Sequence, residues 1–521
     1  MKKFTEKIFK PSSSGVASVI LALASLLSYT LGLGRDIIIS NYFGATHITD
    51  AYNTAFLIPD FIYTISIAGA LSGIFLPIFR KEYNKNNNSG WELAGAFLIT
   101  SQIAVVALSI IAFIAMPWLI NTFFNIEAAE TKLIINLSRI LLLSPIIFTA
   151  SNAIGSMLMS FKHYLAYALS AGLYNGGIIL GLVVWHKQYG IYSAAIGVTI
   201  GLLLHLIIRI IDGYHLESQI RWKIWHPLVK KVYLIAWPKT IGLLAWQICL
   251  WVYNILGQEK LVDGSVAAFN YARNIQSFAV SLFGISIATA IFPFLVDYHS
   301  NNDTKQLRNK LESTLIQVWL YTLPAAVGLA LIAPETVEVL LGRGAFGPEA
   351  TLLTASVLFF FAFSIPFESL THVMARAFYT FNNVITPVIA SIIFMFINMA
   401  GSFYFAITYG PKTFSFFFVV ATLVQIIILL IIFHRKYIKF RLGYLFSNFL
   451  KISAGGALMA IVVYFLDQQI TPLYLRFGVT IFAGGLTYAI WLIPTGLVKY
   501  TGLKRTILSF QRWLPFKLIN E

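Results

Sequence analysis

The chain has 521 residues, of which 58% are hydrophobic and only 11% are charged. Soluble globular proteins carry ~25% charged residues, so this composition excludes a soluble protein and predicts an all-α polytopic membrane protein. The net charge of +16 is typical of basic loops beside anionic lipid, and we expect no nucleic-acid partner. The single cysteine, Cys249, excludes an intramolecular disulfide and a cysteine-based metal cluster.

Long apolar runs predict about fourteen spanning helices, because each crossing of a bilayer needs ~20 mostly apolar residues. Their approximate extents are 13–42, 49–79, 91–120, 131–160, 164–185, 190–211, 229–257, 265–296, 310–333, 350–380, 384–408, 413–434, 445–466 and 472–497.

The distribution of basic residues predicts the orientation of these helices. With the N-terminus in the cytoplasm, the cytoplasmic segments hold 25 lysines and arginines, Arg209 among them, and the external loops hold 6. Basic residues gather in the cytoplasmic loops of membrane proteins. We therefore expect a multi-pass protein of the bacterial cytoplasmic membrane with both termini inside.

A weak internal repeat divides the chain into halves. The segment SIAGALSGIFLP, which ends at Pro77, is similar to ISIATAIFP, which ends at Pro293. A second pair of prolines, Pro145 in SPIIF and Pro366 in SIPFE, recurs at nearly the same spacing along the chain. This predicts two six-helix lobes related by a pseudo-two-fold repeat, plus two C-terminal helices. Transporters built from such repeats bind substrate between their halves.

The expected domains are an N-lobe, a linker, a C-lobe and a C-terminal helix pair with a basic tail, over residues 1–215, 216–228, 229–440 and 441–521. The linker mixes basic residues with Trp222 and Trp225. We interpret it as an amphipathic helix on the inner membrane surface.

Charged residues in the spanning segments are the first candidates for a binding site, because such charges are costly and usually face a bundle interior or a water-filled cavity. The adjacent Arg35 and Asp36 either neutralise each other or contact a ligand. Arg273 lies ~8 residues inside its helix, too deep to reach the nearer surface easily, which favours a cavity. Asp60 has no basic neighbour in sequence and can pair with Arg273, with Lys239 or with a cation.

Two further positions, Asp50 and Pro238, are candidates for gating or coupling. Lys239 follows Pro238, and a proline inside a helix frees a backbone carbonyl and can make a hinge. For Lys239, cavity contact and structural pairing both stay open. Asp50 begins a helix and is first a candidate N-cap. We assign Asp50 and Pro238 to coupling or gating.

Three segments carry a resemblance to a known family. They are GLGRD, FGA, TDAY and IFLPIF within residues 32–79, NYARNIQSFAVSLFGISIATAIFP at 270–293, and LLGRGAF with ARAFYTFNNVITPV within 340–388. The pattern resembles the MurJ/MviN lipid II flippases. The resemblance implies a fold of the multidrug/oligosaccharidyl-lipid/polysaccharide exporter superfamily. It also implies that the chain is a transporter, not an enzyme, and moves an undecaprenyl-pyrophosphate-linked peptidoglycan precursor from the inner to the outer leaflet by alternating access.

The family lines its cavity with arginines, and this chain departs from that pattern. Tyr29 stands where the family has its first arginine, and Leu57 replaces the usual lysine of the second helix. In the eighth helix the arginine is Arg273, one place before Asn274, which turns it by ~100°. The predicted substrate contacts are Arg35, Arg273, Lys239, Asp36, Asp60 and Asn274.

Several functions stay open beside lipid II transport. They are a flippase for another lipid-linked oligosaccharide, a multidrug/cation antiporter of the same superfamily, and a non-transporting membrane scaffold. The expected partners are the lipid-linked glycan, the bilayer and the cell-wall synthesis machinery. No cofactor or metal is expected, and coupling to the membrane potential or to a monovalent cation is left open.

Overall fold

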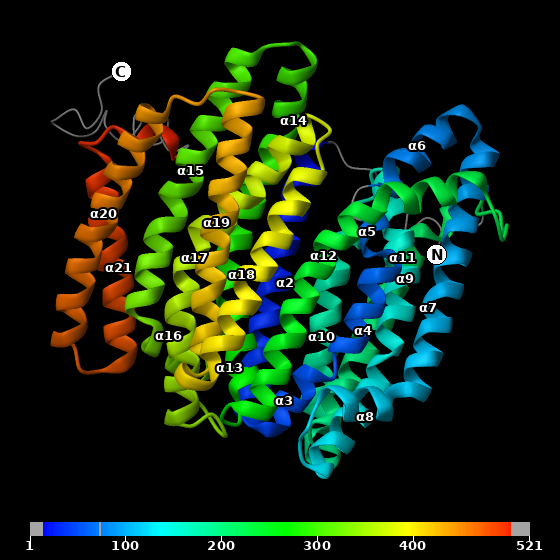
Figure 1. Cartoon of the computed structure of the whole chain (residues 1–521), viewed down its shortest axis with the longest axis horizontal. Helices are drawn as coiled ribbons and strands as arrows, with labels where there is room; N and C mark the ends of the chain where they lie inside the picture. The colour runs from blue at the N-terminus through cyan, green and yellow to red at the C-terminus, as the bar shows by residue number, and fades with distance from the viewer. Residues whose placement is uncertain (1–13, 72–73, 218, 502–521) are drawn as a thin grey trace. The chain divides into compact units, whose positions relative to one another are not determined.

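The computed structural model describes residues 14–71, 74–217 and 219–501. In this part of the chain, thirteen helices are long and apolar enough to cross a membrane. The 30-residue α2 (Ser14–Phe43) adds a fourteenth helix of spanning length (Figure 1). The predicted all-α polytopic fold with about fourteen spanning helices is confirmed.

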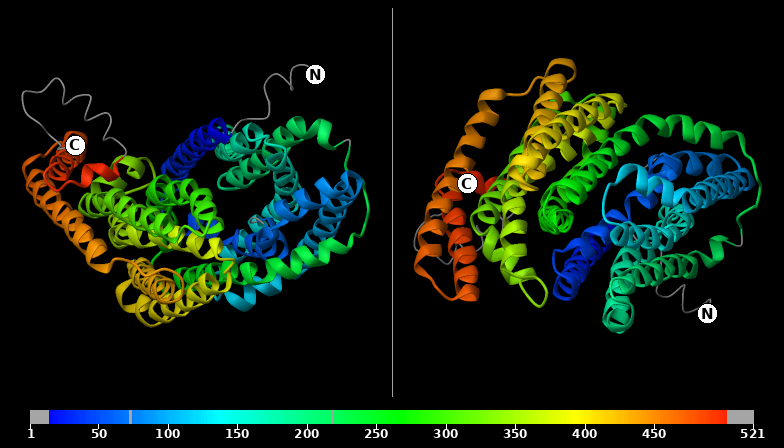
Figure 2. Two further views of the ribbon diagram at one scale, coloured as in Figure 1. Left: turned by 90° about the horizontal axis from the view of Figure 1, so that it is seen from above. Right: turned by 60° about the horizontal axis from the view of Figure 1, so that its bottom comes forward.

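The chain forms two compact units, and the first ends at Ala267 and includes Arg343–Gly347. Besides α2, its elements are α3 (His47–Thr54), α4 (Leu57–Tyr63), the π-helix η1 (Thr64–Ala68), α5 (Gly69–Leu71), α6 (Phe75–Lys85), α7 (Asn87–Phe123), α8 (Ala128–Leu141), α9 (Leu143–Ser160), α10 (Leu165–Tyr189), α11 (Tyr192–Glu217) and α12 (Pro227–Lys260). α10 and α11 lie side by side, and α12 packs against α3, α4 and α5 (Figure 2). The first unit thus includes a helix that the repeat assigns to the C-lobe, and the predicted lobe boundaries stay a prediction.

The second unit contains the remaining described helices. They are α13 (Ser265–Ala279), the π-helix η2 (Val280–Ile285), α14 (Ser286–Ser300), α15 (Thr304–Leu331), α16 (Ala333–Leu341), α17 (Pro348–Thr380), α18 (Ile385–Tyr409), α19 (Lys412–Lys436), α20 (Leu442–Gln469), α21 (Leu473–Leu492) and the short 3-10 helix η3 (Leu497–Tyr500). The first three residues of α13 belong to the first unit. α17 packs against α15 and α19, and the pair α20 and α21 packs beside α15 (Figure 1).

The internal repeat is visible in the backbone. α10 and α18 both have 25 residues, and each ends at a glycine with positive φ, Gly190 and Gly410. Lys162 and Asn382, which precede these two helices by the same number of residues, are two of the three described non-glycine residues with positive φ. The π-helices η1 and η2 recur at nearly the same spacing. Such irregular features recur at one offset because the two halves repeat the same fold.

The linker differs from its predicted structure. Its described residues 219–226 form no helix, so the predicted amphipathic helix is wrong there. Ile220 is buried in the core of the first unit, whereas Trp222 and Ile224 are exposed. The backbone of Arg221 lies directly against Gly95 of α7, where an added Cβ would be 2.1 Å from the Arg221 carbonyl oxygen. This non-helical segment gives the close backbone approach, and Pro227 begins α12 immediately after it.

Three glycines from distant segments form a tight backbone contact in the first unit, which we call the glycine junction (Gly44, Gly264 and Gly344). All three have positive φ. An added Cβ would lie 2.6 Å from the oxygen of Ala345 at Gly44, 2.1 Å from the oxygen of Ala45 at Gly264 and 2.3 Å from the oxygen of Asn41 at Gly344. The Ala345 N–H donates to the Asn41 carbonyl at 2.9 Å. The FGA and RGAF motifs therefore have a packing role.

Replacement of Gly264 by alanine should destabilise the protein more than the same change at Gly410. Both residues have positive φ, which costs an alanine about 1–2 kcal/mol, but an added Cβ meets nothing within 4 Å at Gly410. The Gly264→Ala variant adds a backbone clash to that strain. Thermal unfolding in detergent micelles compares the two variants, and equal melting temperatures would show that the junction tolerates a side chain.

Candidate functional site

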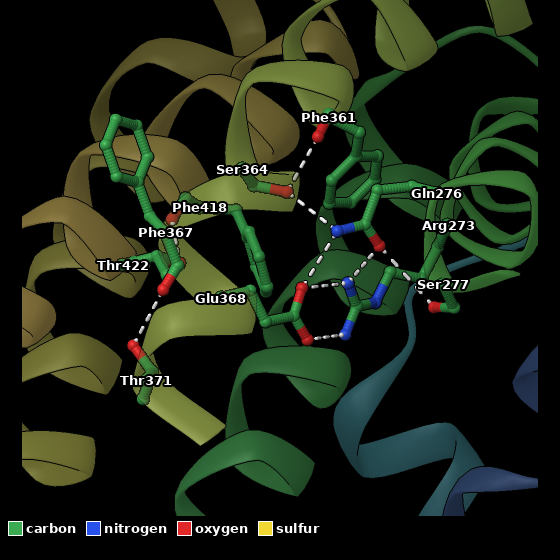
Figure 3. Close-up of polar contacts among 10 residues, drawn as sticks. All are labelled: Arg273, Gln276, Ser277, Phe361, Ser364, Phe367, Glu368, Thr371, Phe418 and Thr422. Atoms are coloured by element: carbon green, nitrogen blue, oxygen red, sulfur yellow. Dashed lines mark hydrogen bonds and ion pairs between the residues drawn. The ribbon is translucent and has the colours of Figure 1, made fainter. Parts of the chain in front are cut away.

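A partly buried charge pair of the second unit joins Arg273 of α13 to Glu368 of α17 (Figure 3). Arg273 Nη1 donates to Glu368 Oε2 and Nη2 donates to Oε1, both at 2.8 Å. This is the paired, planar geometry in which arginine binds carboxylates and phosphates most strongly. The Arg273 and Glu368 side chains are 20% and 16% exposed. Arg273, predicted to contact substrate, thus already holds an internal anion.

Neighbouring side chains fix this pair in place. The Gln276 amide donates to Glu368 Oε2 and to Ser364 Oγ, each at 2.8 Å, and its Oε1 accepts from Arg273 (Figure 3). The Arg273 guanidinium lies over the ring of Phe418 in α19, 4.7 Å from its centroid. Three helices therefore hold one guanidinium. This arrangement stabilises the charged Arg273 side chain. Another bidentate anion can take the place of the Glu368 carboxylate on it.

A second charge pair lies in the first unit. Arg35 donates through Nε and Nη2 to Asp36 Oδ1, at 2.9 and 2.7 Å. Its Nη1 donates to Asn175 Oδ1 of α10 at 3.4 Å, and the Asn175 amide donates to the Ser28 carbonyl. Arg35 and Asp36 therefore neutralise each other, which is one of the two roles expected for them, and Asn175 links them to α10.

Hydrogen bonds also join α4, α9 and α11 in the first unit. The Asn152 amide donates to the Tyr63 hydroxyl at 2.8 Å, and Asn152 Oδ1 accepts from Arg209. The side chain of Asp60 is exposed although α4 lies inside the spanning region, so it faces a space open to solvent or lipid.

The charge count places Arg209 in a cytoplasmic loop, and the structure corrects this. Arg209 lies in α11, is only 3% exposed and is held by neutral groups. Its Nη1 donates to the Ser151 carbonyl at 2.8 Å and to Asn152 Oδ1 at 2.6 Å, and its guanidinium lies 4.8 Å from the centroid of the Tyr167 ring. The helix extends to Glu217, beyond its predicted end at 211. Without Arg209 the basic residues divide 24 to 6, and the predicted orientation does not change.

The remaining candidates occupy structural positions. Asp50 lies in the first turn of α3, where Thr46 is the N-cap. Its carboxylate accepts hydrogen bonds from the backbone N–H groups of Gly264 and Ala267, at 2.8 and 2.7 Å. Asp50 thus ties the glycine junction together and is no N-cap of its own helix.

The α12 helix continues without a break across Pro238. Lys239 is half-buried there, and the next residue, Thr240, meets Gly69 so closely that an added Cβ would lie 1.9 Å from its Oγ1. Asn274 is half-buried on α13, next to Arg273. The predicted convergence of all six contact residues on one cavity stays a prediction.

Sequence reasoning missed Glu368 and Gln276. The signal for Glu368 was present, because it is an acidic residue in the middle of an apolar 33-residue helix, and such a residue requires a partner. Gln276 follows Arg273 by three residues and therefore lies on the same helix face.

Across the described ranges, no three metal-binding side chains come close enough to hold an ion.

The chain matches the family model described as lipid II flippase MurJ over residues 39–483. It belongs to the MurJ family. The match spans most of both units, including the Arg273 and Glu368 cluster, and this family consists of transporters.

Two curated MurJ relatives match nearly full length. The "Probable lipid II flippase MurJ" of Aquifex aeolicus is 27% identical, over 92% of this chain and 94% of the relative. The lipid II flippase MurJ of Thermosipho africanus is 26% identical, over 91% and 95%.

Among solved structures, a lipid II flippase MurJ in an inward closed conformation matches with a TM-score of 0.77 and 23% identity, over 91% of this chain and 98% of that one. An inward-facing multidrug resistance MATE transporter of the MOP superfamily matches with a TM-score of 0.67 and 16% identity, over 84% and 98%. These matches show the fold.

Breaking the charge pair of this MurJ-family protein on one side should be more harmful than removing it entirely. Removing one partner of a buried ion pair costs about 3–5 kcal/mol, because the other charge is left uncompensated. Arg273→Met and Glu368→Met should each lower the free energy of unfolding by about 3 kcal/mol, and the double variant should lose less than either of them. Equilibrium unfolding in mixed micelles measures this, with Glu338→Met at an exposed position of α16 as the control. Additive losses would show that the pair is not coupled.

Proposed function

We propose that this chain is a lipid II flippase, which moves the undecaprenyl-pyrophosphate-linked peptidoglycan precursor from the inner to the outer leaflet of the bacterial cytoplasmic membrane. The observation that carries the proposal is the family match over residues 39–483. Two curated relatives of nearly equal length have names that describe lipid II flippases. Transport proceeds by alternating access, which the internal repeat favours.

In this proposal Arg273 binds the pyrophosphate by anion exchange. Glu368 occupies both outer N–H directions of Arg273, and a pyrophosphate offers the same planar, bidentate acceptors with more negative charge. The incoming anion displaces Glu368 from the guanidinium, and Gln276 keeps the carboxylate hydrogen-bonded. The partial exposure of both side chains supports access to the pair.

The first unit supplies the second part of the proposed site. Arg35 is 23% exposed and binds Asp36 through one carboxylate oxygen. It can therefore turn part of its guanidinium toward a phosphate without losing Asp36. Lys239, Asp60 and Asn274 complete the proposed contacts. Asp60 is also the group through which a monovalent cation would couple to transport, and the membrane potential stays the alternative energy source.

A flippase for another lipid-linked oligosaccharide is the second candidate. One observation favours it: Tyr29 and Leu57 stand where the family has basic residues, so fewer cations are available for the lipid II head group. The multidrug antiporter rests on fold similarity alone. A scaffold without transport is disfavoured, because unused charges at membrane depth are costly. The cell-wall synthesis machinery stays a predicted partner.

The transport proposal predicts that the wild-type chain restores growth to cells depleted of their own lipid II flippase. Arg273→Ala and Arg35→Ala should abolish this rescue even when expression is raised until the folded, inserted variant reaches the wild-type level, because each variant removes a pyrophosphate contact as well as an internal ion pair. Glu368→Gln, which frees Arg273 from its internal anion, should bind undecaprenyl pyrophosphate more tightly. Arg435→Ala, at an exposed position of α19, is the control and should rescue fully.

The possible outcomes separate binding from folding. If both arginine variants still rescue, or if both fail to fold, the charges are structural and the binding role is wrong. If the wild-type chain is inserted but gives no rescue, a different lipid-linked glycan becomes the better candidate.

The proposed orientation places both termini in the cytoplasm, as the distribution of basic residues favours. Single cysteines introduced in a Cys249→Ala background report the side of each loop to an impermeant thiol reagent. A cysteine at Asn301, between α14 and α15, should stay unlabelled in intact cells, and one at Tyr189, where α10 ends, should be labelled. The reversed pattern would overturn the orientation.

A further inference from the structure

An apolar groove opens between α4, α7 and α12 in the first unit. Its volume is about 570 Å³, within the ~300–1,000 Å³ range of small-molecule sites. Only apolar and tryptophan side chains line it, among them Phe61, Leu108, Ala115, Trp118, Phe123 and Trp251. Trp118 is 65% exposed on a spanning helix. The groove therefore opens toward the hydrocarbon of the bilayer, and a hydrocarbon chain is the chemistry that matches it.

The end of the groove lies where α7 ends. Phe123 is the last residue of α7, and the ring of Trp251 lies 5.1 Å from it in an edge contact. Aromatic side chains of this kind gather at the level of lipid head groups. The Phe123 and Trp251 rings therefore mark the end of the groove at which a lipid head group lies.

Charged groups beyond this end indicate which head group fits. Two residues after Phe123, the Asn125 N–H donates to Glu259 Oε1 at 2.7 Å. Lys260 Nζ lies 3.8 Å from the Glu259 carboxylate, and Glu127 is exposed on the same loop as Asn125. Two carboxylates and one ammonium disfavour a pyrophosphate, whose charge is strongly negative. They complement a zwitterionic head group, which carries one ammonium and one phosphate.

We infer that this groove binds one acyl chain of a zwitterionic glycerophospholipid, with its head group at the Glu259 and Lys260 end. The groove shares no residue with the Arg273 and Glu368 pair, and the inference does not depend on the identity of the transported glycan. The bound chain fills the space between α4 and α12.

Photolabelling tests this site in the full-length protein. The chain is reconstituted in vesicles of phosphatidylethanolamine and phosphatidylglycerol, with a trace of phosphatidylethanolamine that carries a diazirine on its acyl chain. After irradiation, mass spectrometry should find label on α7 between residues 108 and 123 and on α12 between 248 and 251. Phosphatidylglycerol carrying the same diazirine should label these segments less.

Ala115→Trp fills the groove and should lower this labelling about tenfold, the factor that ~1.4 kcal/mol of lost binding gives. Ala107→Trp is the matched control, because Ala107 is exposed on α7 and does not line the groove. Melting temperatures verify that both variants are folded. Leu108→Trp, at the other end of the groove, replaces Ala115→Trp if that variant unfolds.

Three results would overturn the inference. The first is labelling that neither groove variant lowers. The second is equal labelling by both phospholipids, which would remove the head-group preference. The third is labelling of these segments by a diazirine-bearing undecaprenyl pyrophosphate but not by phosphatidylethanolamine, which would assign the groove to the tail of a polyprenyl carrier.

Discussion

A charge inside a membrane needs a partner within the protein, and this requirement shapes both units. A charged side chain at the bilayer centre costs ~3 kcal/mol on insertion scales, and this chain meets the cost in two ways. Arg273 and Arg35 bind carboxylates. Arg209 instead binds backbone and amide oxygens and lies over an aromatic ring. Arg273 and Arg209 join helices that are distant in sequence through these bonds, and Arg35 does so through Asn175. These contacts therefore also restrict how the joined helices rotate against one another.

The fold could be predicted from the sequence because length and hydropathy decide which segments cross a membrane. The repeat could be predicted because its prolines recur at nearly one offset, and Gly190 and Gly410 show the same recurrence in the backbone. Local geometry was harder to predict. The second spanning segment is divided into α3, α4, η1 and α5, which an apolar run does not reveal. The linker is not helical, because Ile220 is buried in the core and the linker backbone packs against Gly95. Both contacts are tertiary.

The candidate site was predictable in its cations and in one of their partners. Arg35 and Arg273 stand out because they interrupt apolar helices, and Asp36 follows Arg35 directly. The other partners lie far away in sequence, Glu368 95 residues from Arg273 and Asn175 140 residues from Arg35. Which carboxylate meets which guanidinium depends on helix rotation and depth, and neither can be read from one sequence. Arg209 was misplaced because it lies in the last turn of the predicted helix 190–211 and was counted with the loop after it, whereas the helix continues to Glu217.

Under the proposed function, a preformed ion pair is an advantage for transport. A transported anion must bind strongly enough to enter and weakly enough to leave. A bare guanidinium in a low-dielectric site would hold pyrophosphate too tightly, because charge interactions strengthen as the dielectric constant falls. Glu368 competes for Arg273 throughout the cycle and therefore lowers the net gain from binding. It also spares the protein an uncompensated charge after release. Glu368 thus lowers the affinity of Arg273 for the transported anion. The same two hydrogen bonds that hold the ion pair together keep the binding of that anion reversible.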